Sequence, residues 1–155
     1  MPSVFIASDH RGFALKNKLR EAYPEFTDLG PRTYDPTDDY NDGAIAVAKA
    51  VLAHPGSFGV LVCGSAIGVS IQANRFKGVR AAIVTSLETA KLARAHNDAN
   101  VLCLSADALA EAKDPLESEK HLEDTLALVD AFLNTPFSNE PRHLRRIKRL
   151  DKEPS

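Results

Sequence analysis

The chain has 155 residues and a formal net charge of −2, from 19 Lys and Arg against 21 Asp and Glu. This length and a hydrophobic content of 44% suit one globular domain with a complete core. The near-neutral charge excludes a general attraction to nucleic acid or to an anionic membrane, and no apolar run approaches the roughly 20 residues that cross a membrane. No basic or cleavable leader precedes the first apolar run, so we expect a cytoplasmic protein.

The first half of the chain alternates between short apolar runs and segments with helical periodicity. In chain order it predicts a strand, a helix, a weaker strand, a loop rich in Pro and Asp, and a helix capped by Asp42, at 4–7, 13–23, 26–29, 31–40 and 43–53. In the first helix, Leu15, Leu19 and Ala22 are spaced by four and three, as expected for one buried helix face.

The second half continues the alternation. It predicts a strand, a helix, a strand, a helix and a strand at 59–63, 67–76, 80–84, 87–96 and 100–104. A long amphipathic helix is then indicated by the 4, 3, 4 spacing of Leu122, Leu126, Val129 and Leu133. After Pro136, a basic helix is expected around 142–150.

Five strands that alternate with helices predict an α/β fold. We expect a single-domain, open, parallel five-stranded sheet with helices on both faces and a C-terminal basic helix. The domain would cover 1–150, with a short tail at 151–155. In such sheets the ligand binds beyond the carboxyl ends of the strands, so the segments that follow the strands are the candidates for a site.

The segment after the third strand is the most informative of these. Cys63 directly precedes Gly64-Ser65-Ala66-Ile67-Gly68, at the start of a helix. Amide N–H groups at such a turn stabilise an anion, and a helix N-terminus favours the thiolate of a cysteine. The spacing of the glycines matches neither a P-loop nor a dinucleotide fingerprint. A reactive thiol and a buried apolar cysteine both remain open for Cys63, whereas Cys103, in mid-strand, is expected to be buried filler.

Two histidines are further candidates. His10 lies between Asp9 and Arg11 at a strand end, and His96 lies in the last turn of a helix, just before Asn97. A histidine at a helix C-terminus is also stabilised by the helix dipole, so a capping role for His96 competes with a catalytic one. No spacing of His, Cys and Asp resembles a metal site.

The basic tail also allows two interpretations. In a helix that begins near Pro141, Arg142, Arg146 and Arg149 lie on one face, and apolar residues lie on another, namely Leu144, Ile147 and Leu150. Such a face is usually solvated, but a pair of guanidinium groups is also an effective clamp for a phosphate dianion. The helix could reach the site of its own chain or that of a neighbouring subunit.

Taken together, these segments carry a family resemblance. They occur in this order: Ser8-Asp9-His10-Arg11-Gly12, Cys63-Gly64-Ser65-Ala66-Ile67-Gly68 on to Asn74, His96-Asn97-Asp98-Ala99-Asn100-Val101-Leu102, and Arg142 with Arg146. Over residues 3 to about 149 the chain resembles type B ribose-5-phosphate isomerases and their galactose-6-phosphate isomerase relatives. The resemblance implies a Rossmann-like or flavodoxin-like sheet and a homodimer or homotetramer with shared sites, working without metal or cofactor.

The resemblance also implies roles for individual residues. Cys63 would be the general base of an aldose–ketose isomerase that interconverts ribose 5-phosphate and ribulose 5-phosphate. His96 would help to open the sugar ring, and Ser65 would belong to the catalytic group. Substrate-binding roles fall to the remaining matched residues: Asp9, His10, Tyr40, Gly64, Ala66, Ile67, Gly68 and Asn97, with Arg142 and Arg146 on the phosphate.

Some positions depart from the family pattern. Certain relatives have Ser at the Cys63 position and a Glu base further along the loop, but this loop offers only Ala66 and Ile67 there. Asp107 stands where many relatives have an arginine that helps to bind substrate, and a carboxylate there would repel a phosphate. Another small sugar or sugar phosphate therefore stays open as the substrate, as does a non-catalytic sugar-phosphate module with Cys63 as a redox-sensing thiol.

Overall fold

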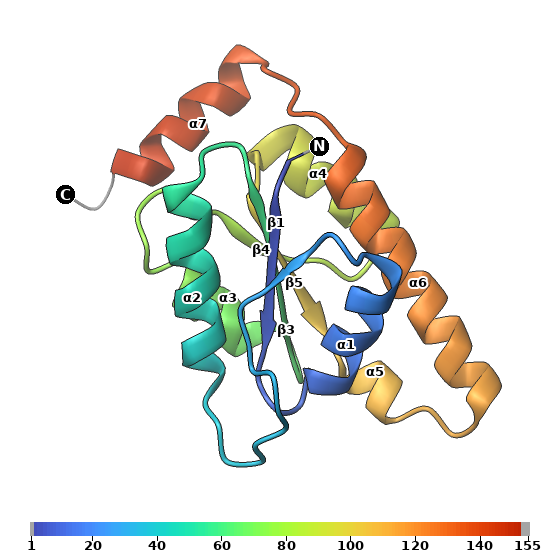
Figure 1. Cartoon of the computed structure of the whole chain (residues 1–155). Helices are drawn as coiled ribbons and strands as arrows, with labels where there is room; N and C mark the ends of the chain where they lie inside the picture. The colour runs from blue at the N-terminus through green and yellow to red at the C-terminus, as the bar shows by residue number, and fades with distance from the viewer. Residues whose placement is uncertain (1, 153–155) are drawn as a thin grey trace.

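The computed structural model describes residues 2–152 and shows one parallel sheet enclosed by helices (Figure 1). The strands are β1 (Val4–Ser8), β2 (Thr27–Asp28), β3 (Phe58–Cys63), β4 (Ala81–Ile83) and β5 (Val101–Ser105). All pairs are parallel, in the order β2-β1-β3-β5-β4. The predicted α/β class with an open five-stranded sheet is therefore confirmed.

Helices cover both faces of the sheet, as predicted. They are α1 (Phe13–Ala22), α2 (Tyr40–Ala53), α3 (Ile67–Ala73), α4 (Leu87–Asn97), α5 (Asp107–Ala110), α6 (Pro115–Asn134) and α7 (Pro141–Lys152). Buried residues of α1, α4 and α6 pack on one face, against Val60 and Val62 of β3. Those of α2 and α3 pack on the other face, against Leu61 and Cys63. Both faces of β3 are buried, which explains its nearly continuous apolar sequence.

The strand order exposes β4. β5 pairs with both β3 and β4, so the last strand in sequence lies inside the sheet and β4 lies at its edge. Ile83 at the end of β4 is 41% exposed. An edge strand with an exposed apolar side chain is a surface on which another chain can pack.

Several predicted boundaries were wrong. α2 begins at Tyr40, with Asp39 as its N-cap, so Asp42 lies in the first turn and not at the cap. α3 ends at Ala73, before the predicted end near 76. The four-residue helix α5 was not predicted. α7 extends to Lys152, so the predicted tail at 151–155 begins inside this helix, and 153–155 lie outside the described residues.

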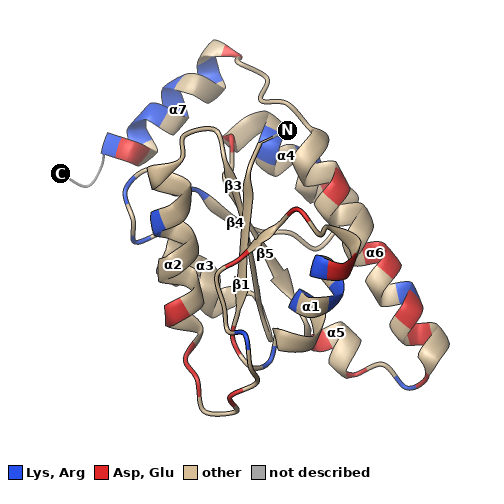
Figure 2. Ribbon diagram, viewed as in Figure 1, with Lys and Arg blue, Asp and Glu red and all other residues tan. Residues whose placement is uncertain are grey.

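The basic C-terminal helix lies beyond the end of the sheet where β1 and β3 begin, whereas the loops after β1 and β3 lie at the opposite end (Figure 1). Lys and Arg recur along α7, and Asp and Glu are prominent on α6 and in the loop before α2 (Figure 2). Within α7, His143 and Ile147 are the buried residues, while Leu144 and Leu150 of the predicted apolar face are exposed. Among residues 2–152, the helices are too short or too polar to cross a bilayer.

Candidate active site

Cys63 lies at the carboxyl end of β3, where the strand turns into α3. Its Sγ accepts a hydrogen bond from the backbone N–H of Ala66 at 3.2 Å, and the residue is only 4% exposed. Ala66 has φ of 69°, in the left-handed region, which lets the chain reverse and bring its N–H back to the sulfur. The thiol is therefore buried, and its sulfur faces an amide donor at the start of a helix.

The turn after Cys63 is held by a hydrogen bond within the turn and by packing against a tyrosine ring. Ser65 Oγ accepts from the N–H of Ile67 at 3.2 Å. Gly68 lies directly against the ring of Tyr40, because a Cβ on Gly68 would approach the ring carbons within 2.8–2.9 Å. Tyr40 and the 64–68 turn, both candidates from the sequence, therefore lie in contact.

The residues after β1 lie at the same end of the sheet. Asp9 is buried and its Oδ1 accepts from the N–H of Gly12 at 2.9 Å, which anchors the start of α1. His10 is partly exposed, and its ring Nδ1 lies 2.7 Å from Oδ1 of Asp38. Asp38 was missed in the sequence, since a loop aspartate 28 residues from His10 has no local signal that pairs it with that ring.

Asp107 does not stand alone at this end. Its Oδ1 accepts from Nη2 of Arg11 at 2.5 Å, so the carboxylate that the sequence presents as a repulsive charge is paired with a guanidinium. Neither side chain is buried, at 55% exposure for Arg11 and 36% for Asp107. Arg11 is the second functional candidate at this end that the sequence did not single out.

The remaining candidates gather around the end of α4. The rings of His96 and His143 pack with centroids 4.3 Å apart and planes tilted by 30°. Burial, together with the neighbouring charge of His96, lowers the pKa of His143. Arg142 pairs with Glu140 at 3.0 Å, and Arg146 lies one turn further along α7. His96 lies in the last turn of α4, which ends with Asp98 as its C-cap in a left-handed conformation.

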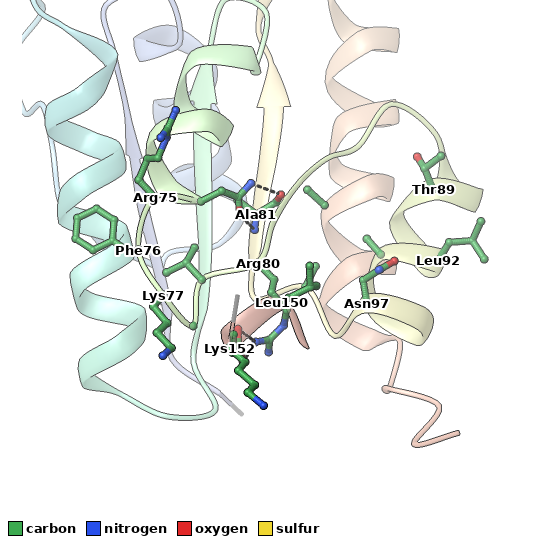
Figure 3. A pocket seen from close by; sticks show the side chains of 17 residues that line it. Arg75, Phe76, Lys77, Arg80, Ala81, Thr89, Leu92, Asn97, Leu150 and Lys152 are labelled. Carbon is green, nitrogen blue, oxygen red and sulfur yellow. Dashed lines mark hydrogen bonds and ion pairs between the residues drawn. The ribbon is translucent and has the colours of Figure 1, made fainter. Parts of the chain in front are cut away.

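Asn97, next to His96, opens onto a cavity of about 890 Å³ (Figure 3). The cavity lies between the segment after α3, the exposed strand β4, α4 and the end of α7. Its labelled side chains combine apolar contacts with positive charges: Phe76, Leu92 and Leu150 with Arg75, Lys77, Arg80 and Lys152.

The predicted site residues thus form two groups at opposite ends of the sheet. Asn100, just after the His96 group, accepts through its carbonyl from the N–H of Gly59 at the start of β3. Cys63 is at the end of the same strand. The six residues of β3 rise by about 3.3 Å per step, which separates its two ends by about 17 Å. Within one chain, Cys63 and His96 therefore cannot contact the same small molecule.

A metal site and the second cysteine, Cys103, are the remaining possibilities for site chemistry in the part of the chain that the structure describes. No three His, Cys, Asp or Glu side chains in residues 2–152 are grouped to hold a metal ion. Cys103 is fully buried in β5, and burial raises the pKa of its thiol, as expected for a filler cysteine.

The chain is similar to known proteins over nearly its whole length. The family profile described as Ribose/Galactose Isomerase matches residues 4–150. The chain is 40% identical to the probable ribose-5-phosphate isomerase B of Mycoplasma pneumoniae, over 95% of this chain and 91% of that protein. It is 39% identical to the ribose-5-phosphate isomerase B of Mycobacterium tuberculosis, over 93% of this chain and 85% of that protein.

Solved structures agree. The ribose-5-phosphate isomerase B of Mycoplasma genitalium with bound ribulose-5-phosphate superposes with a TM-score of 0.83 at 39% identity, covering 97% of this chain and 94% of that one. The enzyme of Thermotoga maritima gives a TM-score of 0.84 at 37% identity, covering 97% and 98%. The chain described here belongs to the ribose/galactose isomerase family.

Proposed function

We propose that the protein is an aldose–ketose isomerase that interconverts ribose 5-phosphate and ribulose 5-phosphate. The observation that carries the proposal is the Cys63 sulfur, which lies at a helix start and accepts the N–H of Ala66 at 3.2 Å. Proton transfer next to a carbonyl needs a base near the operating pH and donors directed at the developing oxyanion. The turn at 64–68 provides backbone N–H groups beside that sulfur.

The proposed reaction moves one proton between neighbouring carbons. Cys63, as the thiolate, removes the proton from C2 of the open-chain aldose, and the electron pair forms the C1–C2 double bond of an enediolate. The negative charge on O1 is held by N–H groups of the 64–68 turn. A proton then passes from the O2 hydroxyl to O1, the thiol returns its proton to C1, and the electron pair of the double bond forms the new C1–H bond as the C2 carbonyl of the ketose forms and the thiolate is restored. His10 and Tyr40 line this half of the site, with Asp9 and Ser65.

The other half of the site would come from a second copy of the chain. His96 and Asn97 would open the sugar ring, while Arg142 and Arg146 would bind the phosphate. This sharing is supported by the separation of Cys63 and His96 across the sheet. Exposed apolar side chains beside the 64–68 turn, called the catalytic turn below, and along the β4 edge offer the area that a second copy would cover: Ile67, Ile71, Ile83 and Leu87. We therefore propose a homodimer, or a homotetramer built from such dimers.

Turnover of ribose 5-phosphate in D₂O tests the function. An isomerase that uses a general base exchanges the C2 proton of ribose 5-phosphate with solvent, and the loss of the C2 proton signal is followed by NMR. Cys63→Ala serves as the control for background exchange. If the wild-type protein binds ribose 5-phosphate without isomerising it or exchanging the proton, the non-catalytic sugar-phosphate module replaces the isomerase.

A further inference from the structure

Arg11 lies directly over the turn that follows Cys63. Its guanidinium packs so closely on Gly64 that any side chain at that position would collide with it. Nη2 of Arg11 donates to Oδ1 of Asp107 at 2.5 Å, and the arginine side chain is still 55% exposed. A guanidinium has five N–H donors, so this single contact leaves donors available to a ligand.

The partner of Arg11 is itself fixed to the catalytic turn. The N–H of Asp107 donates to the carbonyl of Gly64 at 3.1 Å, and the N–H of Ala106 donates to the carbonyl of Cys63 at 2.9 Å. Ser105 Oγ also donates to the carbonyl of Gly64, at 2.5 Å. The carboxylate of Asp107 is therefore held in a defined position relative to the sulfur, and Arg11 is held with it.

Negative charge collects at this end of the sheet, so a phosphate can bind here only beside a positively charged side chain. Asp9, Asp38 and Asp107 place three carboxyl groups at this end of the sheet, and these carboxylates repel a phosphate dianion. The carboxylate of Asp38 contacts the ring of His10, and that of Asp107 forms an ion pair with Arg11. Arg11 offsets the negative charge of Asp107, and its guanidinium is suited to bind phosphate through two parallel N–H groups.

Cys63 and Arg11 lie at different depths below the surface, so they suit different ends of a bound sugar phosphate. Cys63 is 4% exposed, whereas Arg11 is exposed at the mouth of the same turn. The carbons that exchange the proton belong beside the sulfur, so the charged end of the substrate extends outward past Arg11. Building on the proposed isomerase function, we propose that Arg11, from the same chain as Cys63, binds the substrate phosphate together with Arg142 and Arg146 of the second copy. Asp107 then acts as the residue that positions it.

Arg11→Ala tests the contact. We expect KM for ribose 5-phosphate to rise about 10- to 100-fold, the loss of a hydrogen bond to a charged group, with kcat changed far less. Arg20→Ala is the matched control, because Arg20 is also an exposed arginine in an ion pair, with Asp28 at 3.2 Å, but lies on the body of α1. Circular dichroism verifies the fold of both variants.

Two further variants separate binding from positioning. Asp107→Asn leaves Arg11 unrestrained, so KM rises only a few-fold and kcat is retained. The double variant Arg11→Ala with Asp107→Arg supplies a guanidinium from the other side of the pair, and we expect it to recover most of the lost affinity. A purely structural role for the ion pair predicts the opposite: the double variant would be no better than Arg11→Ala.

Calorimetric titration with inorganic phosphate keeps this proposal separate from the isomerase function. Phosphate binding needs no turnover, so the comparison of wild type with Arg11→Ala is informative even if ribose 5-phosphate is not isomerised. A wild-type protein without isomerase activity contradicts the proposed function. An active wild type with an unchanged KM and an unchanged phosphate Kd in Arg11→Ala overturns the role of Arg11.

Discussion

A single oxygen of Asp38 holds both the backbone and the ring of His10. Oδ1 accepts from the His10 backbone N–H at 2.9 Å and lies 2.7 Å from ring Nδ1. An ionised carboxylate only accepts hydrogen bonds, so the proton of the neutral ring belongs on Nδ1. Nε2 is then left to interact with the substrate, and the orientation of the ring depends on Asp38.

Asp38→Ala is expected to lower kcat/KM for ribose 5-phosphate about 10- to 100-fold, because His10 loses both the orientation and the tautomer that the carboxylate imposes. Asp35→Ala is the matched control, since its carboxylate lies in the same loop but accepts its hydrogen bonds from Thr37. Steady-state kinetics on both variants provide the test. Equal losses in the two variants would mean that the charge of the loop, and not the contact with His10, matters.

Cys63→Ala is expected to lower kcat about 10²- to 10⁴-fold, the usual contribution of a general base, with substrate affinity within a few-fold of wild type. Cys103→Ala provides the comparison, because Cys103 is the other buried cysteine and lies in β5. Its activity should stay near that of wild type. Near-normal turnover of Cys63→Ala would remove the sulfur from the mechanism.

Lys16 tests the packing of α1 on the sheet. It is fully buried, and its Nζ donates to both oxygens of Asp28, at 3.0 and 3.3 Å, and to the carbonyl of Pro31. We expect Lys16→Ala to lower the free energy of unfolding by about 3 kcal/mol, the lower end of the cost of breaking a buried pair, since Arg20 still pairs with Asp28. Arg20→Ala, which removes a more exposed pair, should cost less than about 1 kcal/mol. Urea unfolding followed by circular dichroism would contradict this if the two losses were equal.

The contact between α4 and α7 is expected to weaken in acid. Burial and the charges of His96, Arg142 and Arg146 lower the pKa of His143 below its ordinary value of 6.5, while Glu140 acts in the opposite direction. The unfolded chain therefore binds the proton more readily, so the stability from this contact is complete above pH 6.5 and is lost as the pH falls below it.

Urea midpoints at pH 7.5 and 5.5 measure this effect. The wild-type midpoint should fall more between the two pH values than that of His143→Gln, which has no ring to protonate. The same fall in both proteins would assign the acid sensitivity to other groups.

Local patterns predicted most of the fold because five short apolar runs and the helices between them depend on neighbouring residues. The errors lie where structure is not determined by residues nearby in the sequence. α5 has only four residues and no apolar period. The position of β5 between β3 and β4 depends on how the strands pack together, and the sequence of a single strand does not reveal it.

The site shows the same division. Cys63 and the 64–68 turn could be found from sequence, because a thiol before a glycine-containing helix start is a local pattern. Asp38 and His10 are 28 residues apart, and Arg11 and Asp107 are 96 apart. Only folding brings such pairs together, so a loop aspartate and an exposed arginine gave no signal on their own.

Mixing two inactive variants tests the central claim, that each site combines Cys63 of one chain with His96 of another. One chain carries Cys63→Ala, and the other carries His96→Ala with Arg146→Ala. In a mixed dimer one site loses both contributions and the other keeps both. Random mixing makes half of the dimers mixed, so about a quarter of the wild-type activity should return. Activity no higher than that of the two variants measured separately would show that the two halves do not form one site.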